Sequence, residues 1–401
     1  MAATAASLNG AADAQISNIE IIDATTASVI SLDLSAQSDG FTINSGAGAD
    51  VIIGSMGVDI INGGAGNDTI TGGAGYDTLT GGSGADTFNV DAGVDTITDL
   101  SGTTTADILN VSSGATVFAA LSAAWTATTG TANAGTANIN ASGYALSLAA
   151  ATGSVGYNIT NSGNAVSLTG SGFADTITGT SNADSISGGN GNDSLSGGAG
   201  NDLLSGGTGD DTLIGGAGND SLTGGVGKDV FAFSYADTLT NGVDTITDFV
   251  SATDYLSLLA SGSTATTAVG SSAVWSDVNV TKVAANALYT LANSTASDVF
   301  NLSSLNVSNG TLSASATTGT ELLKMLATAS NTTASGIAVT SGSQEYLIAY
   351  DGQNTTYSAY VYHGQDSDNN GTLAASEIQL IGVVQGLTAQ GALHSGDAIL
   401  G

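Results

Sequence analysis

The stretch GGAGNDTITGGAGYDTLT at residues 63–80 contains one nine-residue pattern twice, and the pattern returns as GGNGNDSLS at 188–196 and GGAGNDSLT at 215–223. The shared template is Gly-Gly-x-Gly-x-Asp-x-apolar-x. Three glycines in six residues indicate a turn whose backbone adopts positive φ or approaches a neighbouring strand closely. The last three residues, as in TIT at 69–71, place one apolar side chain between two residues that favour strands, so the middle one should face inward. Each repeat therefore predicts one turn and one short strand, and two repeats predict one coil of a flattened parallel solenoid.

Twelve aspartates stand nine residues apart in two runs, one at the sixth position of each repeat. A carboxylate beside a turn whose carbonyl oxygens point inward supplies hard oxygen ligands, and Ca²⁺ takes about six to eight of these. An aspartate that only made turns could equally be Asn or Ser, yet all twelve positions are Asp, so the repeats predict calcium sites. The candidate ligands are Asp50, Asp59, Asp68, Asp77, Asp86, Asp175, Asp184, Asp193, Asp202, Asp211, Asp220 and Asp229, with the turn glycines Gly64, Gly66, Gly73, Gly75, Gly189, Gly191, Gly198, Gly200, Gly207, Gly209, Gly216 and Gly218.

The repeats that depart from the template include GSMGVDIIN at 54–62, GSGFADTIT at 170–178 and GTSNADSIS at 179–187. They lack some of the glycines, and Phe173 and Asn182 replace the glycine before the x-Asp pair. Repeats at the ends of solenoids are commonly atypical. We therefore expect incomplete ion occupancy at these three units.

The composition limits the partners of the chain. The formal net charge is −32, from 35 acidic residues and three lysines, and so few cations exclude a nucleic-acid partner. Cysteine is absent, so no disulfide framework exists. No apolar stretch reaches the length of about 18 residues that predicts a membrane span, and the first residues lack the basic and apolar regions of a cleaved secretory signal. Because the stacked carboxylates repel one another and glycine is costly to order, we expect the repeats to be largely disordered without calcium.

The chain holds an internal duplication. Each run of repeats is followed by the heptapeptide GVDTITD, at 93–99 and 242–248, and then by an apolar strand, ADILNV at 106–111 or TDYLSLL at 253–259. This order predicts two blocks of one design, each closed by a less regular coil. The heptapeptide aspartates either ligate an ion or cap turns, and the sequence leaves both roles open for Asp95, Asp99, Asp244 and Asp248.

Outside the repeats, alternating apolar and polar residues predict further strands. Residues 16–44 alternate in this way and lead into the first block. Residues 112–169 predict a short helix around Val117–Trp125 and then strands that recur about every 8–10 residues between Gly, Ser and Asn. That spacing indicates a β-solenoid or a sandwich that continues between the two blocks.

The C-terminal part changes character after residue 260. The segment TELLKMLATAS at 320–330 predicts one short helix, and EYLIAYD at 345–351 and YSAYVYH at 357–363 predict strands. The segment DSDNNGTLAASE at 366–377 satisfies the EF-hand loop pattern between strand-like flanks. Its candidate ligands are Asp366, Asp368, Asn370, Thr372 and Glu377. The alternative for this segment is a polar turn between strands.

The nonapeptides resemble those of RTX proteins, and the bias toward Ala, Thr, Ser and Gly resembles that of the bacterial surface-layer members of this family. The resemblance implies a parallel β-roll in which each ion lies between repeats n and n+2. Five repeats then give 5 − 2 = 3 ions and seven give 7 − 2 = 5, about eight Ca²⁺ in all, with one more in the 366–377 loop. It also implies type I secretion through an uncleaved C-terminal signal, a bacterial extracellular or cell-surface location, and self-assembly or binding to a cell-surface polysaccharide.

The predicted fold is therefore all-β: a parallel β-roll in two blocks, with added β-rich segments and a β-rich C-terminal domain that carries one short helix. The predicted segments are an N-terminal β segment at 1–44, a first roll with its cap at 45–111, an intervening β-rich segment at 112–169, a second roll with its cap at 170–259, and the C-terminal domain with the secretion signal at 260–401.

The sequence supplies no catalytic motif. It contains no H-E-x-x-H and no G-x-S-x-G, and its Gly-x-Gly strings precede short strands rather than helices. His363 and His394 are expected at the surface or at strand ends. We therefore predict a calcium-binding extracellular structural protein of the surface-layer type and no enzyme. The alternatives are a folding and secretion module of a larger RTX enzyme or toxin, and a calcium-stiffened adhesin whose binding face lies in 112–169 or 260–340.

Overall fold

The computed structural model describes residues 20–25, 29–102, 104–234, 242–250 and 253–259, and nine strands between residues 275 and 400. The regular elements in these ranges are all strands, which confirms the all-β prediction. None of the described residues forms a helix long and apolar enough to cross a membrane. The chain forms two compact units, unit 1 (Met1–Leu195) and unit 2 (Ser196–Gly401), which are described separately. The five-segment division made from the sequence stays a prediction.

Unit 1 consists of short strands joined by tight turns. They are β1 (Ile21–Asp23), β2 (Ser31–Asp33), β3 (Thr42–Asn44), β4 (Val51–Ile53), β5 (Ile60–Ala65), β6 (Thr69–Thr71), β7 (Thr78–Ser83), β8 (Thr87–Val90), β9 (Val94–Gly102), β10 (Ile108–Val111), β11 (Thr116–Thr126), β12 (Ala132–Asn133), β13 (Thr136–Asn140), β14 (Leu146–Ser147), β15 (Thr152–Gly153), β16 (Asn158–Thr160), β17 (Ser167–Thr169), β18 (Thr176–Thr178) and β19 (Ser185–Asn190), and β20 (Ser194–Ala199) crosses into unit 2.

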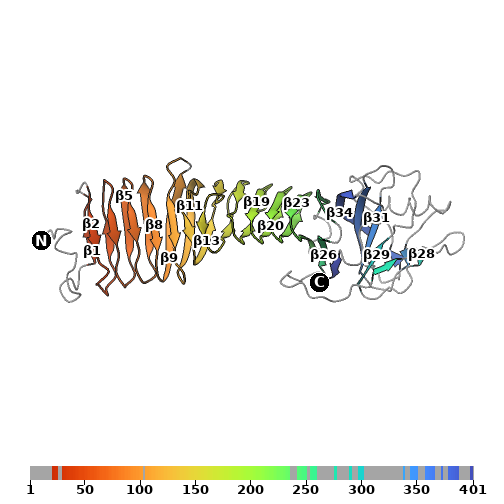
Figure 1. The fold of residues 1–401 in the computed structure, drawn as a ribbon, viewed down its shortest axis with the longest axis horizontal. Coiled ribbons are helices and arrows are strands. Elements are labelled where there is room, and N and C mark those ends of the chain that lie inside the picture. Colours follow the sequence, from red (N-terminus) through yellow and green to blue (C-terminus); the bar gives the residue numbers. More distant parts are fainter. Residues whose placement is uncertain are drawn as a thin grey trace. The chain divides into compact units, whose positions relative to one another are not determined.

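The strands of unit 1 pair in parallel, each with the strand one coil further along the chain. One wall runs β2-β4-β6-β8-β10-β12-β15. The other runs β1-β3-β5-β7-β9-β11 and then divides into β13-β16-β18 and β14-β17-β19, because the long β11 pairs with both β13 and β14. Figure 1 shows the coils in sequence order, from β1 and β2 in red to β13 in yellow. The parallel solenoid predicted from the repeats is confirmed.

The length of a coil differs between the repeat block and the intervening segment. In the repeats, Ile61 pairs with Leu79, so one coil holds 79 − 61 = 18 residues, or two nonapeptides. In the intervening segment, Phe118 pairs with Asn138, so a coil holds 138 − 118 = 20 residues. The segment between the two blocks is therefore a continuation of the solenoid with wider coils, and the sandwich alternative is wrong.

The core of unit 1 is two rows of apolar side chains, one residue from each coil. The central residue of each short strand faces inward, as in β6, where Ile70 is fully buried between two half-buried threonines. Aligned burial of this kind stabilises a solenoid only when neighbouring coils cover each other. The rows are Ile43, Ile61, Leu79, Ile97, Ala119, Ile139, Ile159 and Ile177 on one wall, and Leu32, Ile52, Ile70, Phe88 and Leu109 on the other.

The helix predicted around Val117–Trp125 is wrong, because these residues lie in strand β11. Val117, Ala119 and Leu121 are buried and alternate with more exposed neighbours, which is the period of a strand. A run of Ala and Leu has high helix propensity, but pairing with β9 on one side and β13 on the other overrides that weak preference.

Unit 2 continues the repeats and adds mixed sheets. Its strands are β21 (Leu203–Thr208), β22 (Thr212–Ala217), β23 (Ser221–Val226), β24 (Val230–Ser234), β25 (Asp244–Ile246), β26 (Tyr255–Leu259), β27 (Trp275–Asp277), β28 (Tyr289–Thr290), β29 (Ser297–Asn301), β30 (Ile337–Ala338), β31 (Gln344–Tyr350), β32 (Tyr357–Gln365), β33 (Thr372–Leu373), β34 (Ile378–Leu387) and β35 (Ala398–Leu400). Each repeat strand again pairs in parallel with the second strand after it, as in β21 with β23 and β22 with β24.

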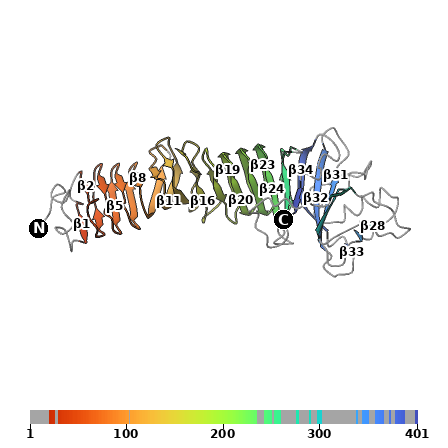
Figure 2. The ribbon, with the colours of Figure 1, turned by 60° about the horizontal axis from the view of Figure 1, so that its bottom comes forward.

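The end of the roll in unit 2 is covered by strands from the C-terminal part of the chain. β34 pairs in parallel with β25, and β35 pairs in parallel with β26. On its other edge β34 pairs antiparallel with β32, which pairs antiparallel with β31, and Figure 2 shows these three blue strands side by side. The short helix predicted at 320–330 lies outside the described residues.

Candidate metal centres

The glycine turns adopt the backbone that the repeat predicts. Gly64 has φ of +98° and Gly66 has φ of +129°, a region that a residue with a Cβ rarely enters. The same positive φ is found at the other candidate turn glycines, Gly73, Gly75, Gly189, Gly191, Gly198, Gly200, Gly207, Gly209, Gly216 and Gly218. The turns are therefore built to one design in both units.

The first glycine of a repeat is needed for space rather than for φ. A Cβ at Gly63 would lie 2.5 Å from Asp68 Oδ2 and 2.8 Å from the carbonyl oxygen of Gly81. A carboxylate oxygen of one repeat and a carbonyl oxygen from two repeats later thus border the same small space. Gly206 has the same surroundings, with Asp211 Oδ2 and the carbonyl oxygen of Gly224 next to its missing Cβ. Oxygens of these two kinds are the ligands that Ca²⁺ takes.

The repeat aspartates form a ladder along the solenoid through one carboxylate oxygen. Asp68 Oδ1 accepts a hydrogen bond from the backbone N–H of Asp50 at 2.8 Å, and the N–H of Asp68 donates to Asp86 Oδ1 at 2.8 Å. In unit 2, Asp202 N–H donates to Asp220 Oδ1 at 2.8 Å. Each bond spans 18 residues and joins one coil to the next. This oxygen therefore has a structural role, which an Asn side chain could also fill.

The other carboxylate oxygen explains why the residue is Asp. The Oδ2 atom is buried and makes no hydrogen bond at Asp50, Asp68, Asp77, Asp95, Asp220 and Asp229. Burial raises the pKa of Asp77 and Asp229 to about 6 and that of Asp95 to about 7, because the charged form is desolvated. A buried carboxylate oxygen without a partner is costly. A cation beside Oδ2 would remove that cost, so the donor set fits Ca²⁺.

The three atypical repeats satisfy Oδ2 in another way. Ser55 N donates to Asp59 Oδ2 at 2.6 Å, and the Ser55 hydroxyl lies 2.9 Å from the same oxygen. Ser171 makes the same two bonds to Asp175, and Thr180 makes them to Asp184. The hydroxyl residue stands where the intact repeats have their second glycine, and Ser142 is the only non-glycine with positive φ among the described residues. These turns therefore have a different backbone, and a side chain serves the carboxylate that an ion would serve elsewhere.

The heptapeptide aspartates occupy two different positions in the fold. Asp95 and Asp244 continue the ladder, since their Oδ1 atoms accept from Asp77 N at 3.2 Å and Asp220 N at 3.1 Å. Asp99 instead caps a glycine turn, with its two oxygens accepting from Gly81 N at 3.0 Å and Gly82 N at 2.7 Å. Asp248 caps the corresponding turn of unit 2 at Gly224 and Gly225 in the same way.

Two further ladder residues were not predicted from the sequence. Asp107 Oδ1 accepts from Asp86 N at 2.9 Å, and Asp254 Oδ1 accepts from Asp229 N at 3.2 Å. Both stand one residue before a strand with a buried second residue, as the repeat aspartates do, but the glycines before them are absent. The Asp-x-apolar ending was the signal that could have found them.

The structure describes only one of the candidate ligands in the EF-hand-like loop. Thr372 lies in β33, whereas Asp366, Asp368, Asn370 and Glu377 of the EF-hand-like loop lie outside the described residues. His363 was expected at the surface or a strand end, but it is buried in β32, and desolvation lowers its pKa to about 4. In the described part of the chain, His, Cys, Asp and Glu side chains nowhere gather in groups of three that could hold a metal. An ion in the rolls would therefore rest largely on backbone carbonyl oxygens.

Comparison with known proteins agrees with this geometry. The family model of the RTX calcium-binding nonapeptide repeat matches the chain four times, at residues 42–70, 62–97, 169–204 and 205–232. These matches and the parallel β-roll show that the chain carries RTX calcium-binding repeats.

The other comparisons add little about activity. The comparison with curated proteins found no match. Solved structures similar to the chain include the solution structure of the AlgE6R3 subunit from the Azotobacter vinelandii mannuronan C5-epimerase. It is 20% identical, the match covers 57% of this chain and 78% of that one, and the TM-score is 0.19. A similarity at this level does not assign an activity.

Proposed function

We propose that this RTX protein is an extracellular structural protein of the surface-layer type, without catalytic activity, whose rolls bind Ca²⁺ and fold when they meet it. One observation supports the calcium part most strongly. Buried Oδ2 atoms without a hydrogen-bond partner, as at Asp68 and Asp77, border the spaces that glycine leaves open. The solenoid places these carboxylates one above another, and without a cation they repel.

The proposed ions lie at the intact glycine turns, held by the aspartate of one repeat and by carbonyl oxygens of the coils around it. About eight ions are expected from the two runs of repeats. They would bring a charge of about +16 against the formal −32 of the chain. The turns capped by Ser55, Ser171 and Thr180 need no ion for their own carboxylates, which supports lower occupancy there.

Calcium-dependent folding fits export as an unfolded chain. Calcium is scarce inside cells and abundant outside, and a ligand that binds only the folded state stabilises it by RT ln(1 + [L]/Kd). A chain with this property stays open where it is made and folds after it leaves. This order is consistent with type I secretion through a C-terminal signal and with a bacterial extracellular or cell-surface location.

Two measurements test the proposal. Circular dichroism of the purified protein should show low β content in chelator at pH 8 and a gain of β structure on calcium addition, with about eight ions bound per chain by elemental analysis. Electron microscopy after calcium addition should then show ordered two-dimensional arrays. Unchanged β content in chelator would contradict calcium-dependent folding. Dispersed, calcium-loaded monomers would contradict the surface-layer role and favour the folding module of a larger RTX protein.

A further inference from the structure

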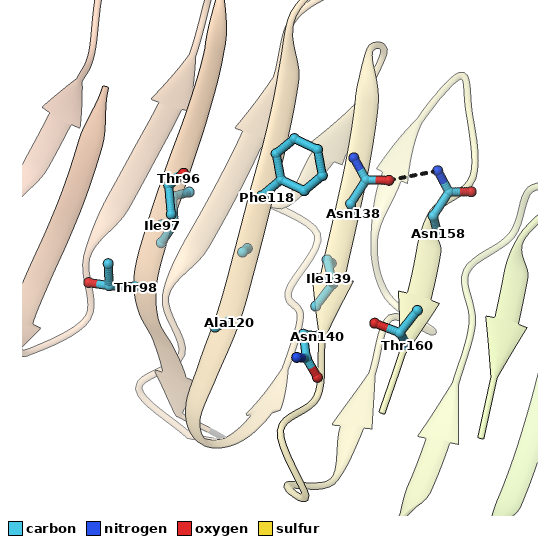
Figure 3. Close-up of a pocket in the computed structure, with 11 residues that line it drawn as sticks. Thr96, Ile97, Thr98, Phe118, Ala120, Asn138, Ile139, Asn140, Asn158 and Thr160 are labelled. Atoms are coloured by element: carbon cyan, nitrogen blue, oxygen red, sulfur yellow. Dashed lines mark hydrogen bonds between the residues drawn. The ribbon is translucent and has the colours of Figure 1, made fainter. Parts of the chain in front are cut away.

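A cavity of about 450 Å³ opens on the outer face of unit 1, across strands β9, β11, β13 and β16. The strand register brings Thr96, Phe118, Asn138 and Asn158 into one row across these strands. Figure 3 shows Phe118 between Thr96 and Asn138 in this row. The cavity lies outside the aspartate ladder, since none of its eleven lining residues is charged.

A second row forms the other side of the cavity. Ala120 pairs with Asn140, and Asn140 pairs with Thr160. The alanine side chain is the smallest in this row, so the outer surface is hollow beside the Phe118 ring. The hollow is therefore bounded by one aromatic face and by amide and hydroxyl groups.

The Phe118 ring lies outside the apolar core. It is 51% exposed on the outside of β11, whereas the core residues Val117 and Ala119 on either side are buried. Its partners in the row are Thr96 and Asn138, the kind of polar residue expected on the outer face of a sheet. Its ring offers a large apolar contact area on a face that is otherwise polar.

The amide groups beside the ring are held in place. Asn158 Nδ2 donates to Asn138 Oδ1 at 3.0 Å, and Asn138 Nδ2 donates to the carbonyl oxygen of Val117 at 3.2 Å. Asn140 Nδ2 donates to the Ser162 hydroxyl at 2.9 Å. An amide carries two N–H groups and two acceptor lone pairs, so each of these side chains keeps capacity for a ligand. Ordered polar groups lose little entropy when they bind.

We propose that this hollow binds a neutral polysaccharide, with Phe118 packed against the apolar face of one sugar ring. Sugar hydroxyls donate and accept hydrogen bonds, as do the amides and hydroxyls that line the hollow. The strands lie about 4.8 Å apart, close to the length of one sugar unit. A chain that crosses them meets the Phe118 ring on β11 and Thr or Asn side chains on β9, β13 and β16. An acidic polymer is disfavoured, because the lining holds no cation and the protein carries a formal charge of −32.

A second copy of the chain is the weaker candidate occupant. A stable protein interface buries about 800 Å² on each partner around an apolar centre. The hollow offers one exposed ring and the small Ala120 side chain, surrounded by asparagine and threonine. That surface suits a narrow, hydroxyl-rich chain better than a protein face.

The test uses the calcium-loaded protein and affinity electrophoresis in gels that contain a neutral β-glucan, a neutral galactomannan or the acidic polygalacturonate. The wild type should be retarded by at least one neutral polymer and not by the acidic one. Phe118→Ala should weaken that binding about tenfold or more, as expected for a central aromatic anchor. Asn158→Ala should weaken it by a smaller factor, and it serves as the second variant if Phe118→Ala does not fold.

Matched control variants distinguish binding in the hollow from binding to any exposed aromatic side chain. Tyr144 is 42% exposed in the same part of unit 1 and does not line the cavity, so Tyr144→Ala should bind like the wild type. Phe118→Tyr keeps the ring and should do the same. Retardation by the acidic polymer alone, the absence of retardation, or full binding by both Phe118→Ala and Asn158→Ala would overturn the proposal. So would sedimentation showing that Phe118→Ala abolishes self-association while polysaccharide binding is unchanged.

Discussion

Two stretches of unit 1 build the same parallel coil by different means. The repeat coils at 45–99 hold 18 residues and carry a ladder of buried aspartates, whereas the coils at 112–169 hold 20 or more and carry neutral side chains. Both stretches bury one apolar residue per strand. The parallel solenoid itself therefore does not require carboxylates. What the aspartates add is a set of buried Oδ2 atoms without a protein partner, at Asp50, Asp68, Asp77 and Asp95.

Asparagine takes the place of aspartate in the wider coils. Asn161 Oδ1 accepts from Gly143 N at 2.8 Å, and Asn161 Nδ2 donates to the carbonyl oxygen of Asn164 at 2.7 Å. Both ends of the amide are thus satisfied by the backbone. At Asp68, in contrast, Oδ1 is bonded and Oδ2 is not. The neutral coils are complete as they stand, whereas the repeat coils keep carboxylate oxygens without a protein partner.

The largest expected loss of stability comes from a substitution in the neutral coils. Trp125 is fully buried, and its indole N–H donates to the carbonyl oxygen of Asp107 at 2.9 Å. Trp125→Ala should lower the free energy of unfolding in saturating calcium by about 3–5 kcal/mol, measured by denaturant titration, while the number of bound ions stays the same. Tyr144→Ala, at an exposed site, should change stability by less than about 0.5 kcal/mol. Loss of bound calcium in Trp125→Ala would show that the two kinds of coil are not independent.

A smaller effect separates two neighbouring repeats. Asp68→Asn keeps the acceptor for Asp50 N but removes the charge of the unsatisfied oxygen, so calcium affinity should fall about tenfold, or about 1.4 kcal/mol. Asp59→Asn places an amide against Ser55 N, so stability should fall by about 1–3 kcal/mol with little change in calcium affinity. Isothermal titration with calcium, together with denaturant titration, measures both quantities. Equal losses of affinity would mean that hydroxyl-capped turns bind ions as well as glycine turns.

The stability of the repeat coils should change with pH in opposite directions with and without calcium. Burial raises the pKa of Asp77 and Asp86 to about 6 and of Asp95 to about 7. The folded state then holds more protons than the unfolded state, so without calcium the repeat coils of unit 1 are stabilised at low pH and lose that stability as pH rises through 6–7. Calcium binding needs the deprotonated carboxylates and should strengthen over the same range.

Hydrogen exchange of unit 1 peptides at pH 5 and pH 8, in chelator and in calcium, measures this pH effect. Peptides from unit 2 are a poorer probe of the aspartates. Burial lowers the pKa of His363 to about 4, so its contribution to stability is lost as pH falls and opposes the effect of the aspartates. Greater protection of the unit 1 repeats at pH 8 than at pH 5 in chelator would contradict the role given to the carboxylates.

The regular part of this molecule could be predicted from the sequence because each position of the repeat has one physical task. The apolar eighth residue fills the core, the glycines form the turn and the aspartate lies beside it, so the repeat pattern alone is enough to assign roles to Ile70, Gly64 and Asp68. For the segment between the two blocks, the pattern could not choose between a solenoid and a sandwich, because short strands between polar turns suit both.

The remaining features depend on contacts that the local pattern does not contain. In the sequence, Ser55 only replaces the second glycine of a repeat. In the structure, its turn differs from the glycine turns and its hydroxyl bonds to Asp59. Asp107 lacks the glycines that mark the other ladder residues, and its role comes from lying one coil after Asp86. Strand β11 has a helix-forming composition, and only its two neighbouring strands keep it extended.

Hydrogen exchange followed by mass spectrometry, in calcium and then in chelator at pH 8, tests the central claim most directly. The repeat coils depend on calcium because they bury aspartate oxygens without partners, whereas the neutral coils depend on it less. Peptides from 63–90 should be protected in calcium and lose protection in chelator well before peptides from 136–169. Simultaneous loss in the two stretches, or full protection of 63–90 in chelator, would contradict the account.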